Sequence, residues 1–142
     1  MSKLYRTTAS LRFFGDTLDP DEISGILGAP PTKALKNGDT WTTGNGTQII
    51  ARTGSWLLYA TDEVPGNLDR QISALFQRLT TDFDAWRELS ARFRGNIFVG
   101  LFLSEFNQGL TLSPEATSAI GLRGLVLDLE IYSAHSVEES NL

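Results

Sequence analysis

Three polar side chains near the end of the chain have the types and the spacing that acid–base chemistry uses. Asp128, Glu130 and Tyr132 alternate with apolar residues in the stretch 125–132. Because successive side chains of a β-strand point to opposite faces, we expect these three to share one face of a sheet. Two carboxylates at close range raise the pKa of one of them, so that one can hold a proton while the other accepts one.

The same face has two other interpretations. It is an ordinary solvated sheet face if its charges only form ion pairs between strands, each worth at most about 1 kcal/mol. It is a protein-binding face if apolar side chains lie among the charges, and Arg6 would join it if the strand at residues 4–14 lies nearby. The sequence therefore predicts no catalytic residue and a candidate binding face made of Arg12, Phe98, Phe102, Asp128, Glu130 and Tyr132.

Other kinds of chemistry find little support in the residues. The chain has no cysteine, which excludes disulfides, thiol catalysis and cysteine-ligated metals, and its one histidine, His135, lies in a polar tail at residues 133–142. The motifs Gly-x-Ser-x-Gly and His-Glu-x-x-His and the phosphate-binding P-loop are absent. An acidic cluster would suit a hard cation, but capping of a helix explains it better. We therefore expect no metal and no cofactor; the cluster consists of Asp16, Asp19, Asp21 and Glu22.

Length and charge limit the possible partners. A chain of 142 residues is one domain, and we place its core at about residues 4–132. A net charge of −5 without a basic cluster argues against nucleic acid. No apolar run reaches the roughly 18 residues of a membrane span, and the first residues lack a signal-peptide core. These features predict a cytoplasmic protein that contacts neither nucleic acid nor membrane.

The longest helical pattern in the chain occupies residues 67–95, and we expect the strands on both sides of it to be organised around it. Its first half has apolar residues at helical spacing, followed by a second helix that we expect Thr81 to cap and Gly95 to end. Asp19-Pro20 and Ser113-Pro114 have the cap-then-proline pattern that begins a helix. The apolar residues of the first half are Leu68, Ile72, Leu75 and Leu79, and we expect Arg70, Gln71 and Arg78 to lie off that apolar face.

Strand patterns lie on both sides of this helical stretch. Residues 41–43, 47–53 and 56–61 predict a meander with Gly54-Ser55 as a hairpin turn. Residues 97–103 are apolar on both faces, which is typical of a central strand or of one covered by a partner. In the last strand, we expect the alternating apolar residues Leu125, Leu127, Leu129 and Ile131 to face the core.

Together the elements predict the order β-α-β-β-β-α-α-β-α-β. This is an α+β protein with helices on one face of a mostly antiparallel sheet, and the two strand–helix–strand halves suggest a ferredoxin-like relative with an inserted helical hairpin.

Several of these segments together resemble a known family. The chain is similar to the bacterial domain-of-unknown-function family 4279 from about residue 4 to residue 132. Members of that family often carry a histidine in the central helix where this chain has Asp69-Arg70-Gln71, so any role of that imidazole does not transfer. The resemblance implies a small bacterial cytoplasmic protein, some of whose relatives look like immunity proteins against toxins. It rests on 18–23 (LDPDEI), 27–28 (LG), 31–32 (PT), 55–56 (SW), 68–79, 110–115 (LTLSPE) and 128–132 (DLEIY).

Three functions are compatible with the sequence. The favoured hypothesis is a small interaction module without enzymatic activity, of which an immunity protein would be one kind. The second is a small-molecule binder or enzyme that uses Arg12, Asp128, Glu130 and Tyr132. The third is a structural homodimer that pairs through the apolar strand at residues 97–103. Fold alone does not decide among them.

Overall fold

The computed structural model describes residues 4–134, which form a curved five-stranded sheet with four helices and a separate two-stranded hairpin. The order of the strands in the sheet is β2-β5-β1-β6-β7. The strands are β1 (Arg6–Gly15), β2 (Lys33–Leu35), β3 (Thr40–Thr42), β4 (Gln48–Ile50), β5 (Gly54–Tyr59), β6 (Arg94–Phe102) and β7 (Val126–Tyr132). The helices are α1 (Pro20–Leu27), α2 (Leu68–Gln77), α3 (Phe83–Arg92) and α4 (Pro114–Leu122).

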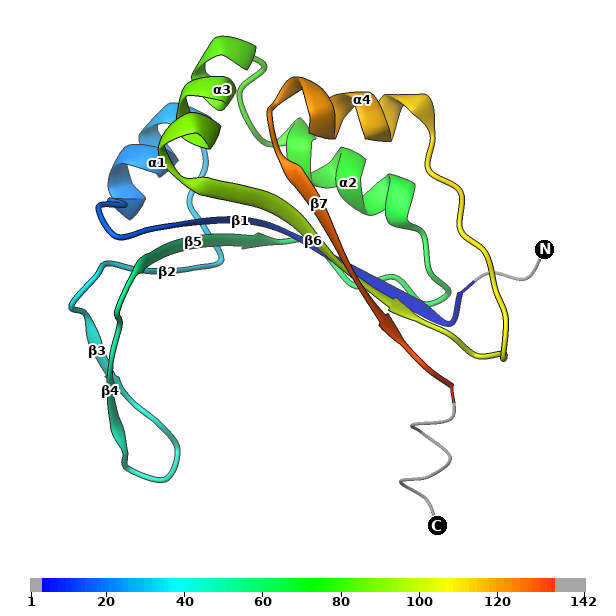
Figure 1. Cartoon of the computed structure of the whole chain (residues 1–142), viewed down its shortest axis with the longest axis horizontal. Coiled ribbons are helices and arrows are strands. Elements are labelled where there is room, and N and C mark those ends of the chain that lie inside the picture. The colour runs from blue at the N-terminus through cyan, green and yellow to red at the C-terminus, as the bar shows by residue number, and fades with distance from the viewer. Residues whose placement is uncertain (1–3, 135–142) are drawn as a thin grey trace.

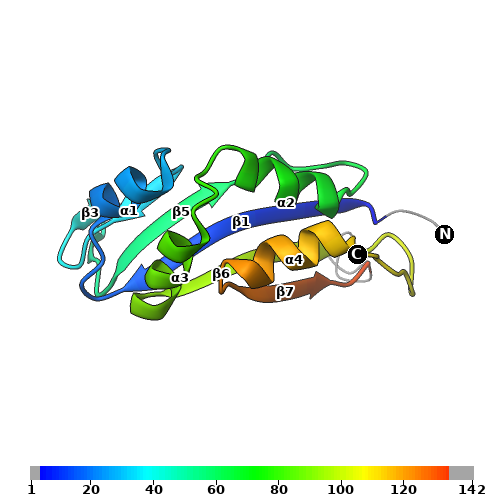
Figure 2. The ribbon, with the colours of Figure 1, turned by 90° about the horizontal axis from the view of Figure 1, so that it is seen from above.

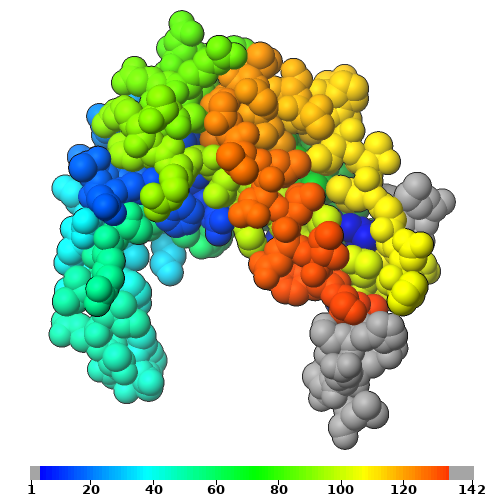
Figure 3. All heavy atoms as spheres, in the orientation of Figure 1, coloured from blue at the N-terminus to red at the C-terminus, as the bar shows by residue number. Residues whose placement is uncertain are grey.

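All of these helices cover the same face of the sheet, and within residues 4–134 no helix covers the opposite face (Figures 1 and 2). The sheet curves away from the helices, and the β3–β4 hairpin projects on the uncovered side. The space-filling view shows the resulting hollow between the hairpin and β7 (Figure 3). We call this uncovered, concave side the open face.

The pairing of the strands confirms an α+β fold with a mostly antiparallel sheet. β1 pairs antiparallel with β5 and β6, whereas β6 and β7 pair in parallel and are joined through α4. In the first half, β1 and β2 run parallel with β5 between them. Because β6 and β7 are direct neighbours, the second half lacks this intervening strand. The ferredoxin-like relation is therefore not confirmed.

Local capping determines where the helices begin. The Asp19 carboxylate accepts a hydrogen bond from the Asp21 N–H and Pro20 occupies the first turn of α1, while Gly28 ends that helix at a φ of 90°. Ser113 caps α4 in the same way, through the Ala116 N–H. Both predicted helix starts are confirmed. They could be predicted because a cap depends on residues only two or three positions away.

The core lies between the sheet and the helices. Phe13 from β1 lies between two buried tryptophans, with ring centroids 6.4 Å from Trp56 and 6.3 Å from Trp86. Each indole N–H has an acceptor: Trp56 donates to the Ser24 hydroxyl at 3.0 Å and Trp86 to the Thr80 carbonyl at 2.8 Å. These aromatic rings hold α1 and α3 against the sheet.

Two predicted boundaries around glycines are wrong. Gly54 and Ser55 do not form a hairpin turn but begin β5, which pairs with β1 rather than with β4. Gly54 is needed there because a Cβ would lie 2.9 Å from the carbonyl oxygen of Gly15. Gly95 does not end a helix either; it lies inside β6, and α3 ends at Arg92.

The helical pair also differs in detail from the prediction. Asp82 rather than Thr81 caps α3, since its carboxylate accepts from the N–H groups of Asp84 and Ala85. The sequence pattern put Gln71 off the buried face of α2, yet only 2% of its surface is exposed. A short strand, β2, was not predicted at all.

The helix-facing side of β7 is less covered than predicted. Leu125 is buried, but Leu129 is 47% and Ile131 is 64% exposed. β7 is the outermost strand, and α4, which packs beside α2 and contacts β7, does not bury the second half of that strand (Figure 2). The apolar strand at residues 97–103 is confirmed as central, because β6 lies between β1 and β7.

Candidate functional site: the open face and the edge strand

The open face brings the six predicted residues onto one surface, with Arg12 at its centre. The Arg12 guanidinium lies 4.1 Å from the ring centroid of Phe98 and reaches Asp128 across β6, with Nη2 3.8 Å from Oδ2. Its Nε donates to Asn96 Oδ1 at 3.0 Å. Stacking on an aromatic face and pairing with a carboxylate hold the guanidinium in one position.

A second aromatic group lies further along the same face. The rings of Phe102 and Tyr132 stack with centroids 4.4 Å apart and an interplanar angle of 7°. Arg6 covers the other side, 4.7 Å from the Phe102 centroid, and its Nε donates to Asp62 Oδ2 at 3.1 Å. The expectation that Arg6 joins this face is therefore met.

The two carboxylates of β7 have separate partners. Asp128 pairs with Arg12, whereas Glu130 accepts a hydrogen bond from the Tyr132 hydroxyl, which raises the pKa of that tyrosine. This arrangement is that of an ion-paired sheet face. Use of Asp128 and Glu130 as an acid–base pair stays a prediction.

A shallow hollow of about 330 Å³ lies beside Arg12 on the open face. Its walls come from β1, β5 and β6 and from the loop after β5, and they include Arg12, Tyr59, Asp62 and Phe98. The β3–β4 hairpin beyond it exposes Trp41, Ile49 and Ile50. Apolar and charged groups therefore lie side by side around this hollow.

The outer edge of β7 carries backbone groups that no strand of the described chain pairs with. The Tyr132 carbonyl accepts from the Leu103 N–H, so Tyr132 directs its backbone groups toward β6. Because alternate residues of a strand direct these groups to opposite sides, Leu127, Leu129 and Ile131 direct theirs outward. An unpaired edge of this length is a template for another strand.

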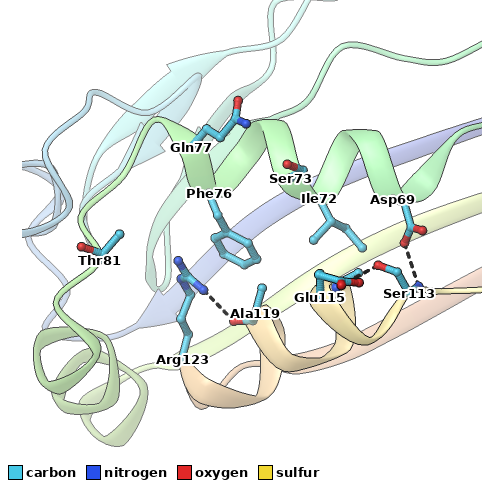
Figure 4. Close-up of a pocket in the computed structure, with 11 residues that line it drawn as sticks. Asp69, Ile72, Ser73, Phe76, Gln77, Thr81, Ser113, Glu115, Ala119 and Arg123 are labelled. Atoms are coloured by element: carbon cyan, nitrogen blue, oxygen red, sulfur yellow. Dashed lines mark hydrogen bonds between the residues drawn. The ribbon is translucent and has the colours of Figure 1, made fainter.

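A pocket that sequence reasoning missed lies in the helical layer, between α2 and α4 (Figure 4). It encloses about 290 Å³, and its walls include Ile72, Phe76 and Ala119, with Arg123 at one end and Asp69 at the other. Arg123 follows the last residue of α4 and belongs to no amphipathic pattern. The one available signal was a lone arginine between two apolar runs, at 119–122 and 125–127.

The acidic cluster forms caps and ion pairs instead of a ligand set. Asp19 caps α1, and Glu22 accepts from Arg92 Nη2 at 2.8 Å, which raises the pKa of that arginine. Within residues 4–134, no three histidine, aspartate or glutamate side chains gather in a way that could hold a metal ion. His135 lies outside the described residues.

None of the helices described between residues 4 and 134 has the length and apolar character that crossing a membrane requires.

Taken together, the fold and its surfaces define a small α+β domain with helices on one side and an open, concave sheet face on the other. The chain belongs to the family described as Domain of unknown function (DUF4279), which matches residues 3–134 and so nearly the whole chain. The resemblance expected from the sequence is thereby confirmed, and the family's description assigns no activity. No curated protein and no solved structure matches the chain.

Proposed function

We propose that this protein is an interaction module that binds an extended segment of a partner protein along the edge of β7. The single observation that carries the proposal is the outward row of backbone groups at Leu127, Leu129 and Ile131, flanked by exposed side chains of β7. A strand that joins such an edge gains main-chain hydrogen bonds, and its alternate side chains supply specificity.

The charges of β7 indicate what that segment would look like. Asp128 and Glu130 lie on the open face of the strand, while Leu129 and Ile131 lie on the other face. A partner strand would therefore place lysine or arginine beside the two carboxylates and apolar residues beside Leu129 and Ile131. Opposite charges directly across a strand pair stabilise it by up to about 1 kcal/mol each.

The same charges disfavour a homodimer through this edge. In an antiparallel pair centred on Leu129, Asp128 of one copy would face Glu130 of the other, on both sides of the axis. Like charges directly opposite are destabilising. The net charge of −5 adds a general repulsion between copies. A basic foreign segment therefore fits the edge better than a second copy does.

An immunity protein, which blocks a toxin by binding it, is one kind of module that would use such an edge. The open face beside β7 would then meet the body of the partner, with Phe102 and Tyr132 at the contact. Aromatic residues next to charged ones are typical of such contacts.

The proposal is tested by titration with synthetic peptides of about nine residues, the length of a long strand. One peptide alternates lysine and valine, a second has glutamate in place of lysine, and a third has the lysine sequence with N-methylated backbone positions. We expect binding of the first peptide only, measured by fluorescence anisotropy. Equal binding of the lysine and glutamate peptides, or of the N-methylated one, would contradict the proposal.

Variants locate the contact on the protein. Leu129→Pro removes an N–H that points away from β6, so we expect it to abolish binding while the fold persists. Ile131→Ser should weaken binding, whereas Ile50→Ser, at a similarly exposed position of the hairpin, should not; the two isoleucines are 64% and 61% exposed. An unchanged affinity in Leu129→Pro would rule out the edge as the binding site.

A further inference from the structure

The pocket between α2 and α4 contains a buried positive charge without a carboxylate partner. Arg123 is 6% exposed, and among residues 4–134 it forms no ion pair. Its Nη1 donates to the Ala119 carbonyl at 2.9 Å, but its Nε is buried and finds no acceptor in this part of the chain. A guanidinium has five N–H donors, so most of them are left for another group.

Aromatic rings surround this guanidinium on the side of α2 and α3. Ring centroids lie 4.1 Å away for Phe76, 5.1 Å for Phe83 and 5.2 Å for Trp86. Such contacts offset part of the cost of burying a charge, and burial lowers the pKa of Arg123. They do not replace the hydrogen bonds of a planar oxyanion, which a guanidinium binds with two parallel N–H groups.

The opposite end of the pocket carries negative charge. Asp69 and Glu115 lie at the starts of α2 and α4, and Asp69 Oδ1 accepts from the Ser113 N–H at 3.1 Å (Figure 4). Phe76, which contacts Arg123, lies seven residues after Asp69 on α2, or about 10 Å along a helix that rises 1.5 Å per residue. The wall between the two ends is mostly apolar, with Ile72, Phe76, Ala116 and Ala119, and Ser73 is a polar exception.

We propose that this pocket binds a small, elongated zwitterion, with its carboxylate at Arg123 and its ammonium group at Asp69 and Glu115. An ω-amino acid or a free basic amino acid has this chemistry, and about 290 Å³ is at the small end of ligand pockets. Inorganic phosphate fits less well, because the pocket has two carboxylates against one guanidinium. This site shares no residue with the β7 edge, because its walls come from α2, α4 and the loops beside them.

The test is isothermal titration of the full chain with 6-aminohexanoate and with L-lysine, accompanied by melting curves. Hexanoate and hexylamine are matched probes that each lack one charged end. We expect at least one of the zwitterions to bind and to raise the melting temperature, and both matched probes to bind at least about tenfold more weakly. Inorganic phosphate should bind more weakly than either zwitterion.

Variants of the pocket separate binding from folding. Arg123→Met keeps the apolar stem and should weaken zwitterion binding by at least about tenfold, whereas Arg92→Met, a change of an exposed arginine on α3, should not. If Arg123→Met does not fold, Ser73→Phe fills the mouth of the pocket from the exposed side of α2 and should abolish binding. The proposal is overturned if no zwitterion binds at millimolar concentration, if phosphate binds more tightly, or if Ser73→Phe binds normally.

Discussion

A buried hydrogen-bond network joins β1 to α2, and its contribution to stability can be measured by substitution. The Thr7 hydroxyl donates to Gln71 Oε1 at 2.6 Å and accepts from the Asn67 N–H at 2.9 Å. Gln71 Nε2 in turn donates to the carbonyls of Thr7 at 2.8 Å and Thr61 at 3.0 Å. This network therefore attaches the start of α2, which carries one wall of the Arg123 pocket, to the centre of the sheet.

Replacing Thr7 by valine removes the hydroxyl at nearly constant volume. Two groups then lose their partner: the Gln71 Oε1 acceptor, which is buried, and the Asn67 N–H, which is partly buried. At about 1–3 kcal/mol for each of the two unsatisfied groups, we expect Thr7→Val to lower the free energy of unfolding by about 2–6 kcal/mol. The assay is urea denaturation followed by the fluorescence of the buried tryptophans.

A control and a double variant decide whether the network is the cause. Thr42→Val, on the exposed strand β3, should change the free energy of unfolding by less than about 0.5 kcal/mol. Adding Gln71→Met to Thr7→Val should cost less than the sum of the two single changes, because the second removes groups that the first left unpaired. A loss below about 0.5 kcal/mol in Thr7→Val would refute the reasoning.

Three further changes have expected outcomes. Gly95→Ala places a Cβ 2.7 Å from Phe13 Cε1, so overpacking should cost about 1–3 kcal/mol in urea denaturation. Glu130→Gln should lower the pKa of Tyr132, measured by ultraviolet titration against Tyr132→Phe. Because folding raises the pKa of Tyr132, the protonated tyrosine stabilises the fold. This contribution to the free energy of unfolding is complete below the ordinary tyrosine pKa and is lost as the pH rises through the pKa of Tyr132 in the folded protein. Asp19→Ala removes the cap of α1 and should cost about 1 kcal/mol in the same urea assay.

Each of these three predictions has a result that would contradict it. An unchanged stability of Gly95→Ala would mean that the ring of Phe13 moves aside without cost. A Tyr132 titration that is identical in Glu130→Gln would exclude the hydrogen bond as the cause of the raised pKa. A similar loss in Asp19→Asn, which keeps a capping oxygen, would show that the charge rather than the cap is responsible.

Local features of the sequence predicted much of the fold and of the open face. The starts of α1 and α4 depend on Asp19 and Ser113 and on their immediate neighbours. The open-face residues follow from the alternation of a strand, which is why Asp128 and Tyr132 were placed correctly on one side. Arg12 was also expected on this face, but its pairing with Asp128 across β6 was not predicted.

The features that were missed depend on contacts between distant parts of the chain. Gly54 has the local character of a turn, but its role is close approach to Gly15 in a neighbouring strand. Gln71 is polar and was assigned to the surface, since nothing nearby in the sequence reveals Thr7 as its partner. Arg123 was missed because only the packing of the helices encloses it.

The exposure of β7 belongs to the same class of error. Its apolar residues alternate as they would in a strand covered by helices, and the sequence pattern cannot show that β7 is an edge strand whose second half the helices leave exposed. That difference matters for function, because it leaves Leu129 and Ile131 available at an open edge.

The most direct test of the proposed strand addition is amide hydrogen exchange, followed by NMR with and without the lysine–valine peptide. The N–H groups of Leu129 and Ile131 point away from β6, so the account predicts that their exchange slows when the peptide is bound. The N–H groups of Asp128 and Glu130 already point toward β6 and should change little. Unchanged exchange at Leu129 and Ile131 in the saturated complex would contradict the account, because the peptide would then bind elsewhere.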